Sequence, residues 1–574
     1  MLGKTDPLRV IGLTARTAAR PPRTARLPTC AGRAGSDPGR AVSSCPVSLT
    51  EAGPAEPVAP VTGPLPAPGA GAPTPDERRR LRFVRRFGTT GALLMALGAL
   101  GCGATPAPAY NPLLGTRVLG LWSRMPTVSL TLAYIGMGML VLAWLWLGRL
   151  AWPGRVRLSV RQLTRILAMW TAPIAVAPPL FSTDVYGYLS QAEVVSRGFD
   201  PYVFGAAQAL GLDDPLVASI PTIWRTTPSP YGPGFLSLGR VITGVAGDDI
   251  VLGVYLHRLL ALLGIALVVW AVPRLARRAG VEPIAALWLA VSPLVLFHLV
   301  SGIHNDAIML GVVLAGLEVG FRWSWFAGAV LIGLGASGKI PAVLALAFLA
   351  AHVARAHGGG IARLLRWGAA VAGTGIGMVV AVSLGSGLGF GWVNALSVPN
   401  LLRSWLSVTT DLGVLGGWIG RALGLGDHTD AVLDLTRAAG LGVAALVCAV
   451  LVIAVLNGRL HPVAGVAYGF GAVFLAGPVL HPWYLLWAVV PLAASVASPR
   501  VRGVAVGVCA VVALLVPPTG ADFSFRTYQL PMAITAALLL AVVPLLAARG
   551  RTPRIPPRVT SDAPSLPAPG APRT

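Results

Sequence analysis

Long apolar runs, separated by short polar segments, fill most of this 574-residue chain. Most of these runs are about 17 to 25 residues long, which is the length of α-helix that crosses a hydrocarbon core. We therefore predict an all-α integral membrane protein, a polytopic bundle of about 12 to 14 transmembrane helices. The candidate spans are 88–104, 127–150, 162–180, 250–273, 283–301, 305–321, 324–338, 340–354, 365–386, 436–457, 461–479, 482–498, 503–519 and 530–548.

The two ends of the chain lack this apolar pattern. Residues 1–80 are rich in Pro, Ala, Gly and Arg, and residues 549–574 have a similar composition. Neither segment has enough apolar surface to offset the entropy of ordering the chain, so we expect both to be disordered tails. No apolar stretch follows the first arginines, so we expect no cleavable secretory signal. The transmembrane domain is then predicted to occupy 88–548.

Composition and charge support a membrane location. Hydrophobic residues make up 55% of the chain, charged residues only 12%, and the mean hydropathy is +0.71. The net charge of +23 comes from arginines in the tails and in short segments between apolar runs. Basic residues gather in this way on the cytoplasmic side, so we expect a cell-membrane protein with both termini cytoplasmic. The expected partners of these arginines are membrane lipids and not nucleic acid.

Two long polar segments, at about 181–249 and 387–435, fall on the opposite, extracytoplasmic face in this topology. The first contains seven acidic residues and three arginines. Both are rich in Trp, Tyr, Pro and Gly, which favours short helices lying at the interface over a cavity. We call them the first and the second long loop.

Two acidic motifs lie at the expected membrane edge. Asp184 follows the third candidate span, where partial desolvation would raise its pKa toward that of a general base. The triplet His304-Asn305-Asp306 opens the sixth span, where polar side chains are costly unless they face a wet cavity. Each motif is also consistent with a plain helix N-cap. The candidate catalytic residues are Asp184 and, as an alternative, Asp306.

Two basic residues are candidates for binding a phosphate. Lys339 is one of only two lysines and lies in an apolar run, followed by Pro341. A buried cation there is costly, which favours an anionic partner and a broken helix at this point. The alternative is a lysine that extends to the interface. Arg403 in the second long loop is the other candidate.

Aromatic and imidazole side chains are frequent in the same loops. They are able to stack on a sugar face, although a belt of interfacial aromatics or structural histidines would have the same composition. The candidate sugar-binding residues are Tyr186, Tyr188, Trp224, Tyr231, His304, Asn305, Trp405, His481 and Trp483.

Several kinds of chemistry lack their sequence signals. The chain contains no P-loop, no dinucleotide-binding GxGxxG motif, no HExxH and no GxSxG. The five cysteines show no metal-ligating or disulfide spacing, so we expect no metal and no cofactor. No loop on the cytoplasmic face is long enough to bind a nucleotide sugar, so a sugar donor would come from the bilayer.

Six motifs occur in a fixed order along the predicted transmembrane domain. These motifs are Asp184-Val-Tyr-Gly-Tyr, Gly198-Phe-Asp-Pro-Tyr, Pro228-Ser-Pro-Tyr-Gly-Pro, His304-Asn-Asp, Gly338-Lys-Ile-Pro and His481-Pro-Trp-Tyr. Together they resemble a known family, the actinobacterial polyprenol-phosphate-mannose-dependent α-1,6-mannosyltransferases of the MptA/MptB type. The resemblance covers residues 88–548.

The resemblance implies a GT-C fold, a polyprenyl-phosphate-mannose donor and a lipid-linked mannan acceptor, the core of lipomannan and lipoarabinomannan. It also implies an inverting transfer with one acidic base, a role that we assign by resemblance to Asp184. Related enzymes often have this acid on the first outer loop, but residues 105–126 contain no Asp or Glu. The base assignment therefore stays open between Asp184 and Asp306.

Two other functions are compatible with many spans and buried charges. A lipid-linked-sugar flippase or transporter would show repeated halves and polar groups at the bilayer midplane, whereas the polar motifs here gather on one face. A polyprenyl-phosphate-pentose transferase, such as an arabinofuranosyl transferase, differs only in its sugar. The residues do not separate it from a mannosyltransferase without the resemblance.

Overall fold

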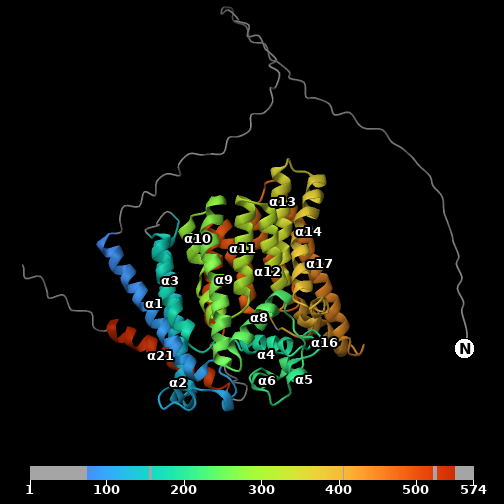
Figure 1. Cartoon of the computed structure of the whole chain (residues 1–574). Coiled ribbons are helices and arrows are strands. Elements are labelled where there is room, and N and C mark those ends of the chain that lie inside the picture. Colours follow the sequence, from blue (N-terminus) through green and yellow to red (C-terminus); the bar gives the residue numbers. More distant parts are fainter. Residues whose placement is uncertain (1–73, 154–157, 405, 521–526, 550–574) are drawn as a thin grey trace, which may run out of the picture. The chain divides into compact units, whose positions relative to one another are not determined.

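A computed structural model describes residues 74–153, 158–404, 406–520 and 527–549 of the chain. Within these ranges all regular structure is helical, and no strand occurs (Figure 1). The prediction of an all-α polytopic membrane protein is confirmed.

Among the described residues, four helices are long and apolar enough to cross a membrane by length and composition: α2 (Pro126–Ala151), α9 (Ile250–Arg278), α14 (Ile361–Gly385) and α17 (Thr429–Leu456). A fifth span results if α10 (Pro283–Ala290) and the π-helix η3 (Val295–Ser301), which meet at 58°, count as one. The chain is therefore a multi-pass membrane protein, and the count of about 12 to 14 spans stays a prediction. Shorter apolar segments are α12 (Trp325–Gly338), η4 (Ile340–Val343) with α13 (Leu344–Ala356), α18 (Pro462–Ala476), η6 (Pro482–Tyr484) with α19 (Leu485–Ser495), and α21 (Gln529–Arg549).

The first helix begins before its predicted span. The hydroxyl of Thr74 accepts from the backbone N–H of Glu77, whose carboxylate accepts from the backbone N–H of Thr74, and this reciprocal capping starts α1 at Pro75. Residues 75–80, expected in the N-terminal tail, are therefore helical, and residues 1–73 and 550–574 lie outside the described residues. Other helices are α1 (Pro75–Cys102), η1 (Pro108–Tyr110), η2 (Leu119–Arg124), α3 (Val160–Val176), α11 (Asp306–Arg322) and α20 (Pro499–Leu515).

Both long loops fold into short helices at one end of the bundle, below α9, α12 and α17 in Figure 1. The apolar periodicity of the spans is interrupted there by Pro and Gly, which start or end each short element. The first loop forms α4 (Asp184–Ser196), α5 (Ala206–Leu210), α6 (Pro215–Ala218), α7 (Thr222–Arg225) and α8 (Pro233–Ala246), and the second forms α15 (Trp392–Ala395), η5 (Val398–Leu401) and α16 (Val408–Ala422).

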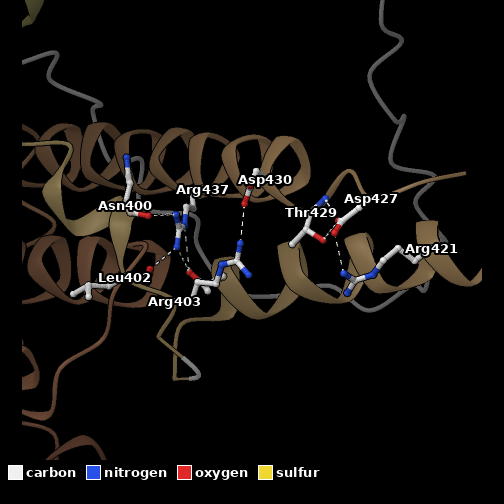
Figure 2. Close-up of polar contacts among 9 residues, drawn as sticks. Asn400, Leu402, Arg403, Arg421, Asp427, Thr429, Asp430 and Arg437 are labelled. Carbon is white, nitrogen blue, oxygen red and sulfur yellow. Dashed lines mark hydrogen bonds and ion pairs between the residues drawn. The ribbon is translucent and has the colours of Figure 1, made fainter. Parts of the chain in front are cut away.

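One buried arginine attaches the second long loop to the bundle. Arg437 of α17 donates hydrogen bonds of 2.8 Å and 2.7 Å to the backbone carbonyls of Asn400 and Leu402, and it also contacts the hydroxyl of Thr410 (Figure 2). Because a guanidinium presents five donors in a rigid plane, one side chain satisfies several carbonyls of an irregular segment. Arg437 therefore holds the end of η5, at Asn400 and Leu402, against α17.

A second buried arginine holds the start of the first long loop. Arg258 of α9 donates hydrogen bonds of 2.9 Å and 2.6 Å to the carbonyls of Ala175 and Ala177, at the end of α3. These carbonyls have no partner within their own helix, because the chain turns away at the end of α3. The segment that leads from α3 to α4 therefore starts from a fixed point.

A close contact between two helices positions the start of α11. A Cβ added at Gly264 of α9 would lie 2.3 Å from the carbonyl oxygen of Ala307, and one added at Gly311 would lie 2.3 Å from the carbonyl oxygen of Gly264. Small residues allow two membrane helices to approach at backbone distance. The first turn of α11 is thereby held against α9.

Candidate active site

A cavity of about 420 Å³ lies where the two long loops, the start of α11, the break between α12 and η4, and the segment before α19 meet. Most of the residues predicted from the sequence line it. These are Asp184, Tyr188, Trp224, Tyr231, Asn305, Asp306, Lys339, His481 and Trp483. His304 is fully buried directly behind this lining, in contact with Asp184 and Trp483.

Two strained turns lead to the cavity. In the described parts of the chain, Phe181 and Ile303 are the two non-glycine residues with positive φ, at 70° and 56°. Such a conformation is unfavourable for any L-residue and most of all for a β-branched one, and it persists only where the surroundings enforce it. Here the ring of Phe181 stacks on Phe297 at 5.2 Å, and the backbone N–H of Leu180 donates to the hydroxyl of Ser301.

These turns place Asp184 beside His304. Phe181 precedes Asp184 by three residues, and Ile303 precedes His304 directly, after the π-helix η3. The Nδ1 atom of His304 lies 3.2 Å from the Oδ2 atom of Asp184. The Asp184 side chain is 29% exposed, whereas His304 is fully buried. The carboxylate therefore faces the cavity with an imidazole behind it.

The pKa of Asp184 differs from the sequence expectation. Burial, which is the largest influence, raises the pKa of this carboxyl, but the contact with His304 and the nearby His481 outweigh it and hold the pKa below its usual value. The expected increase is therefore wrong, because His304 is adjacent only in the folded chain. Asp184 is ionised at neutral pH.

Asp306 has a different environment. Both of its oxygens accept hydrogen bonds of 2.8 Å from the ammonium of Lys339, and Oδ1 also accepts from the indole N–H of Trp487. The Asp306 side chain is fully buried, and that of Lys339 is 15% exposed. Asn305 accepts a third hydrogen bond from the ammonium, at 3.3 Å. Asp306 is therefore saturated by the protein itself.

The broken helix expected around Lys339 is confirmed. Helix α12 ends at Gly338, and η4 begins at Ile340, so Lys339 is the junction residue between them. Its ammonium lies 4.8 Å from the ring centre of Tyr484 and 5.4 Å from that of Trp487, distances at which a cation is attracted to an aromatic face. The cation is thus surrounded on the protein side and lines the cavity on the other.

An aromatic stack contributes to the cavity lining. Trp483 stacks on His304 with ring centres 3.7 Å apart and on His481 with ring centres 4.4 Å apart. Burial lowers the pKa of His481 to about 4, so its ring is neutral at physiological pH. Trp483 and His481 therefore present flat, uncharged surface to the cavity, the kind on which a sugar ring packs.

The predicted tyrosines divide into two groups. Tyr188 and Tyr231 line the cavity and contact each other edge to face at 5.1 Å, and the Tyr188 hydroxyl accepts from the backbone N–H of Asn305. Tyr186 is buried on the other side of α4, where its hydroxyl donates to the carbonyl of Ala104. Tyr186 thus anchors α4 and does not line the cavity.

Two further candidates are not brought to the cavity. Arg403 is 59% exposed and pairs at 2.8 Å with Asp430, next to the Arg437 contacts in Figure 2. Trp405 lies outside the described residues. Asp184 and Asp306 are the first residues of α4 and α11, after the N-cap residues Thr183 and Asn305, so neither aspartate is an N-cap. Asn305 does occupy the N-cap position of α11, but its side chain makes no capping hydrogen bond there.

Sequence reasoning missed several cavity residues. Gln191 follows Asp184 by seven residues, which places both on one face of α4, and this spacing was a usable signal. Tyr484 is the last residue of the His481-Pro-Trp-Tyr motif, and Trp487 follows it by three residues. Within the described ranges no group of three or more His, Cys, Asp or Glu residues is arranged to hold a metal ion.

The ion pair between Lys339 and Asp306 makes a testable contribution to stability. We expect Lys339→Gln to lower the free energy of unfolding by about 3–5 kcal/mol, because it leaves a buried carboxylate without its counter-ion. Adding Asp306→Asn should recover part of this loss, since the unpaired charge is then absent. Thermal unfolding in detergent checks both variants, with Arg403→Gln at the exposed pair as the control that changes little. Additive losses in the double variant would contradict the assignment.

Comparison with known proteins gives the family. Residues 85–355 match the family model described as alpha-(1->6)-mannopyranosyltransferase, N-terminal domain, and residues 409–546 match the MptB C-terminal domain. The chain is 42% identical over 516 residues to a probable alpha-(1->6)-mannopyranosyltransferase of Mycolicibacterium smegmatis, covering 85% of this chain and 91% of the relative.

Two further relatives have the same name. The alpha-(1->6)-mannopyranosyltransferase of Mycobacterium tuberculosis is 40% identical, with 82% of this chain and 88% of the relative covered. The alpha-(1->6)-mannopyranosyltransferase B of Corynebacterium glutamicum is also 40% identical, with 73% and 74% covered. No solved structure matches the chain. The resemblance carried by the six motifs is confirmed, and the chain belongs to the MptA/MptB family of mannosyltransferases.

Proposed function

We propose that this enzyme transfers mannose from polyprenyl-phosphate-mannose to a growing α-1,6-linked mannan, with inversion at the anomeric carbon. The reaction takes place on the extracytoplasmic face, and both termini are cytoplasmic. The names of the relatives support mannose as the sugar and an α-1,6 linkage in the product. The arginine clusters between apolar runs support the orientation.

The difference between the two carboxylates carries the proposal. Asp184 is partly exposed in the cavity, has a low pKa and is therefore ionised and accessible. Asp306 is buried and held by Lys339 and Trp487. A general base must reach the proton that it removes, so geometry favours Asp184 over Asp306.

In the proposed reaction, Asp184 accepts the proton of an acceptor hydroxyl while that oxygen bonds to the anomeric carbon of mannose. The bond from this carbon to the phosphate oxygen breaks, and polyprenyl phosphate leaves with the electron pair. The transition state has oxocarbenium-like character, so the anomeric carbon is strongly electrophilic before the proton is fully transferred. A carboxylate of low pKa is sufficient as the base under these conditions.

Lys339 stabilises the leaving phosphate mainly by its charge. Its three N–H groups already donate to Asp306 and Asn305. An approaching phosphate would therefore share or displace one of these hydrogen bonds. The neighbouring Asp306 cancels part of the positive charge of Lys339, which weakens the attraction of Lys339 to the intact donor. This attraction becomes greatest in the transition state, when negative charge develops on the leaving phosphate. Arg403 plays no such part in this geometry.

The base assignment is tested by mannose transfer from polyprenyl-phosphate-mannose to a short α-1,6-mannoside in membranes. We expect Asp184→Asn to lower the rate by at least about 10²-fold, because loss of a general base typically costs 10²–10⁴-fold. Asp213→Asn, an exposed position in the same loop, serves as the control at matched abundance. Equal rates for Asp184→Asn and wild type would exclude Asp184. Transfer from a pentose donor only would show that the sugar is not mannose.

The pH dependence of the reaction tests the contact with His304. In the wild type, Asp184 stays ionised until the pH falls through its lowered pKa, so kcat/KM decreases only at strongly acidic pH. His304→Gln removes the interaction that lowers this pKa while burial, which raises it, remains. We expect the acidic limb of the profile to move to higher pH, with no such movement for the exposed His428→Gln. An unchanged or downward-shifted limb would contradict this account.

A further inference from the structure

Gln191 is a cavity residue for which the proposed reaction has no role. It lies on α4, seven residues after Asp184, and seven residues span about 10 Å along a helix. Its side chain is 8% exposed, and this exposed part faces the cavity that it lines. A buried amide at this position is costly unless its polar atoms find partners.

A neighbouring serine fixes the orientation of this amide. Ser229 is fully buried, and its hydroxyl donates to the Oε1 atom of Gln191 at 2.7 Å. The same hydroxyl oxygen accepts from the backbone N–H of Tyr231 at 3.3 Å. The serine proton has the amide oxygen of Gln191 as its acceptor, so the other end of the amide is the NH2 group.

That NH2 group has no protein partner. In the described parts of the chain, no group accepts a hydrogen bond from the Nε2 atom of Gln191, and the hydrogen bond of this side chain is the one that Oε1 accepts from Ser229. Asn305 repeats the pattern: its Oδ1 accepts from Lys339, while its Nδ2 is buried with no partner within the same described residues. Both residues line the cavity. Two amides thus have their oxygens occupied and their donors free.

There is room for a ligand between Gln191 and the carboxylate. Gly187 lies between Asp184 and Gln191 on the same face of α4, and it also lines the cavity. A Cβ added at Gly187 would meet no atom within 4 Å. A sugar ring is therefore able to lie against the backbone of Gly187. The carboxylate of Asp184 would accept a hydrogen bond at one end of the ring, and the NH2 group of Gln191 would donate one at the other.

We propose that Gln191 is a specificity-determining residue that binds the acceptor saccharide, donating a hydrogen bond from its amide to one hydroxyl of the sugar that lies over Gly187. This inference deepens the proposed function and rests on it for the identity of the saccharide. The oriented amide selects a sugar with a hydroxyl at the matching position. A sugar without this hydroxyl leaves a desolvated NH2 unpaired, and a site of this kind discriminates strongly against such an analogue.

Binding of a short α-1,6-mannoside to the full-length protein in detergent, measured by calorimetry, tests this proposal apart from catalysis. We expect Gln191→Glu to weaken binding about tenfold, because the new carboxylate still accepts from Ser229 but has no donor for the sugar. The same change at the exposed Gln208, Gln208→Glu, is the matched control and should bind as the wild type does. Ser229→Ala should weaken binding less, since the amide is retained but no longer oriented.

A series of monodeoxy mannosides identifies the hydroxyl. One analogue should bind the wild type about tenfold more weakly than the parent sugar, and this difference should disappear in Gln191→Glu. A ratio within one variant does not depend on how much of the protein is folded. The inference is overturned if Gln191→Glu binds like the wild type, if it keeps the full deoxy penalty, or if the wild type binds no mannoside. Binding by the wild type without mannose transfer would overturn the proposed function and leave the inference standing.

Discussion

The buried ion pair between Lys339 and Asp306 is the interaction on which the rest of the site depends. It joins the first turn of α11 to the break between α12 and η4, two points that are 33 residues apart in the sequence. Each charge alone would be expensive to bury, and the pair is favourable only because further donors and acceptors surround it. Its consequence is chemical: it occupies one of the two carboxylates of the cavity and leaves Asp184 as the accessible one.

The carboxylate of Asp184 is positioned by two turns with strained backbone and by hydrogen bonds that hold the irregular segment before α4. Phe181, three residues before Asp184, and Ile303, directly before His304, adopt unfavourable conformations, and the π-helix η3 precedes the second of these turns. Arg258 fixes the end of α3, from which the first turn starts. Packing of the surrounding helices offsets this strain. As a result, Asp184 and the His304 imidazole that lowers its pKa stay in contact.

The sequence predicted the helical class, the break at Lys339 and most of the cavity lining, because apolar run length and costly polar residues are local signals. It did not predict that His304 faces Asp184, nor that Asp306 is saturated by Lys339, since those contacts join segments far apart in the chain. Tyr186, a candidate sugar-binding residue, does not line the cavity, because it lies on a different face of α4 from Asp184 and Gln191. The helical spacing of these three residues separates Tyr186 from the other two.

The most direct test of the division of roles between the two carboxylates is a structure of the protein with a non-transferable phosphonate analogue of the donor and a short α-1,6-mannoside. The account predicts the acceptor hydroxyl within hydrogen-bond distance of Asp184 and the phosphonate on the side of Lys339, with the Lys339–Asp306 contact retained or shared. An acceptor hydroxyl on Asp306, released from Lys339, with Asp184 distant from both ligands, would contradict it.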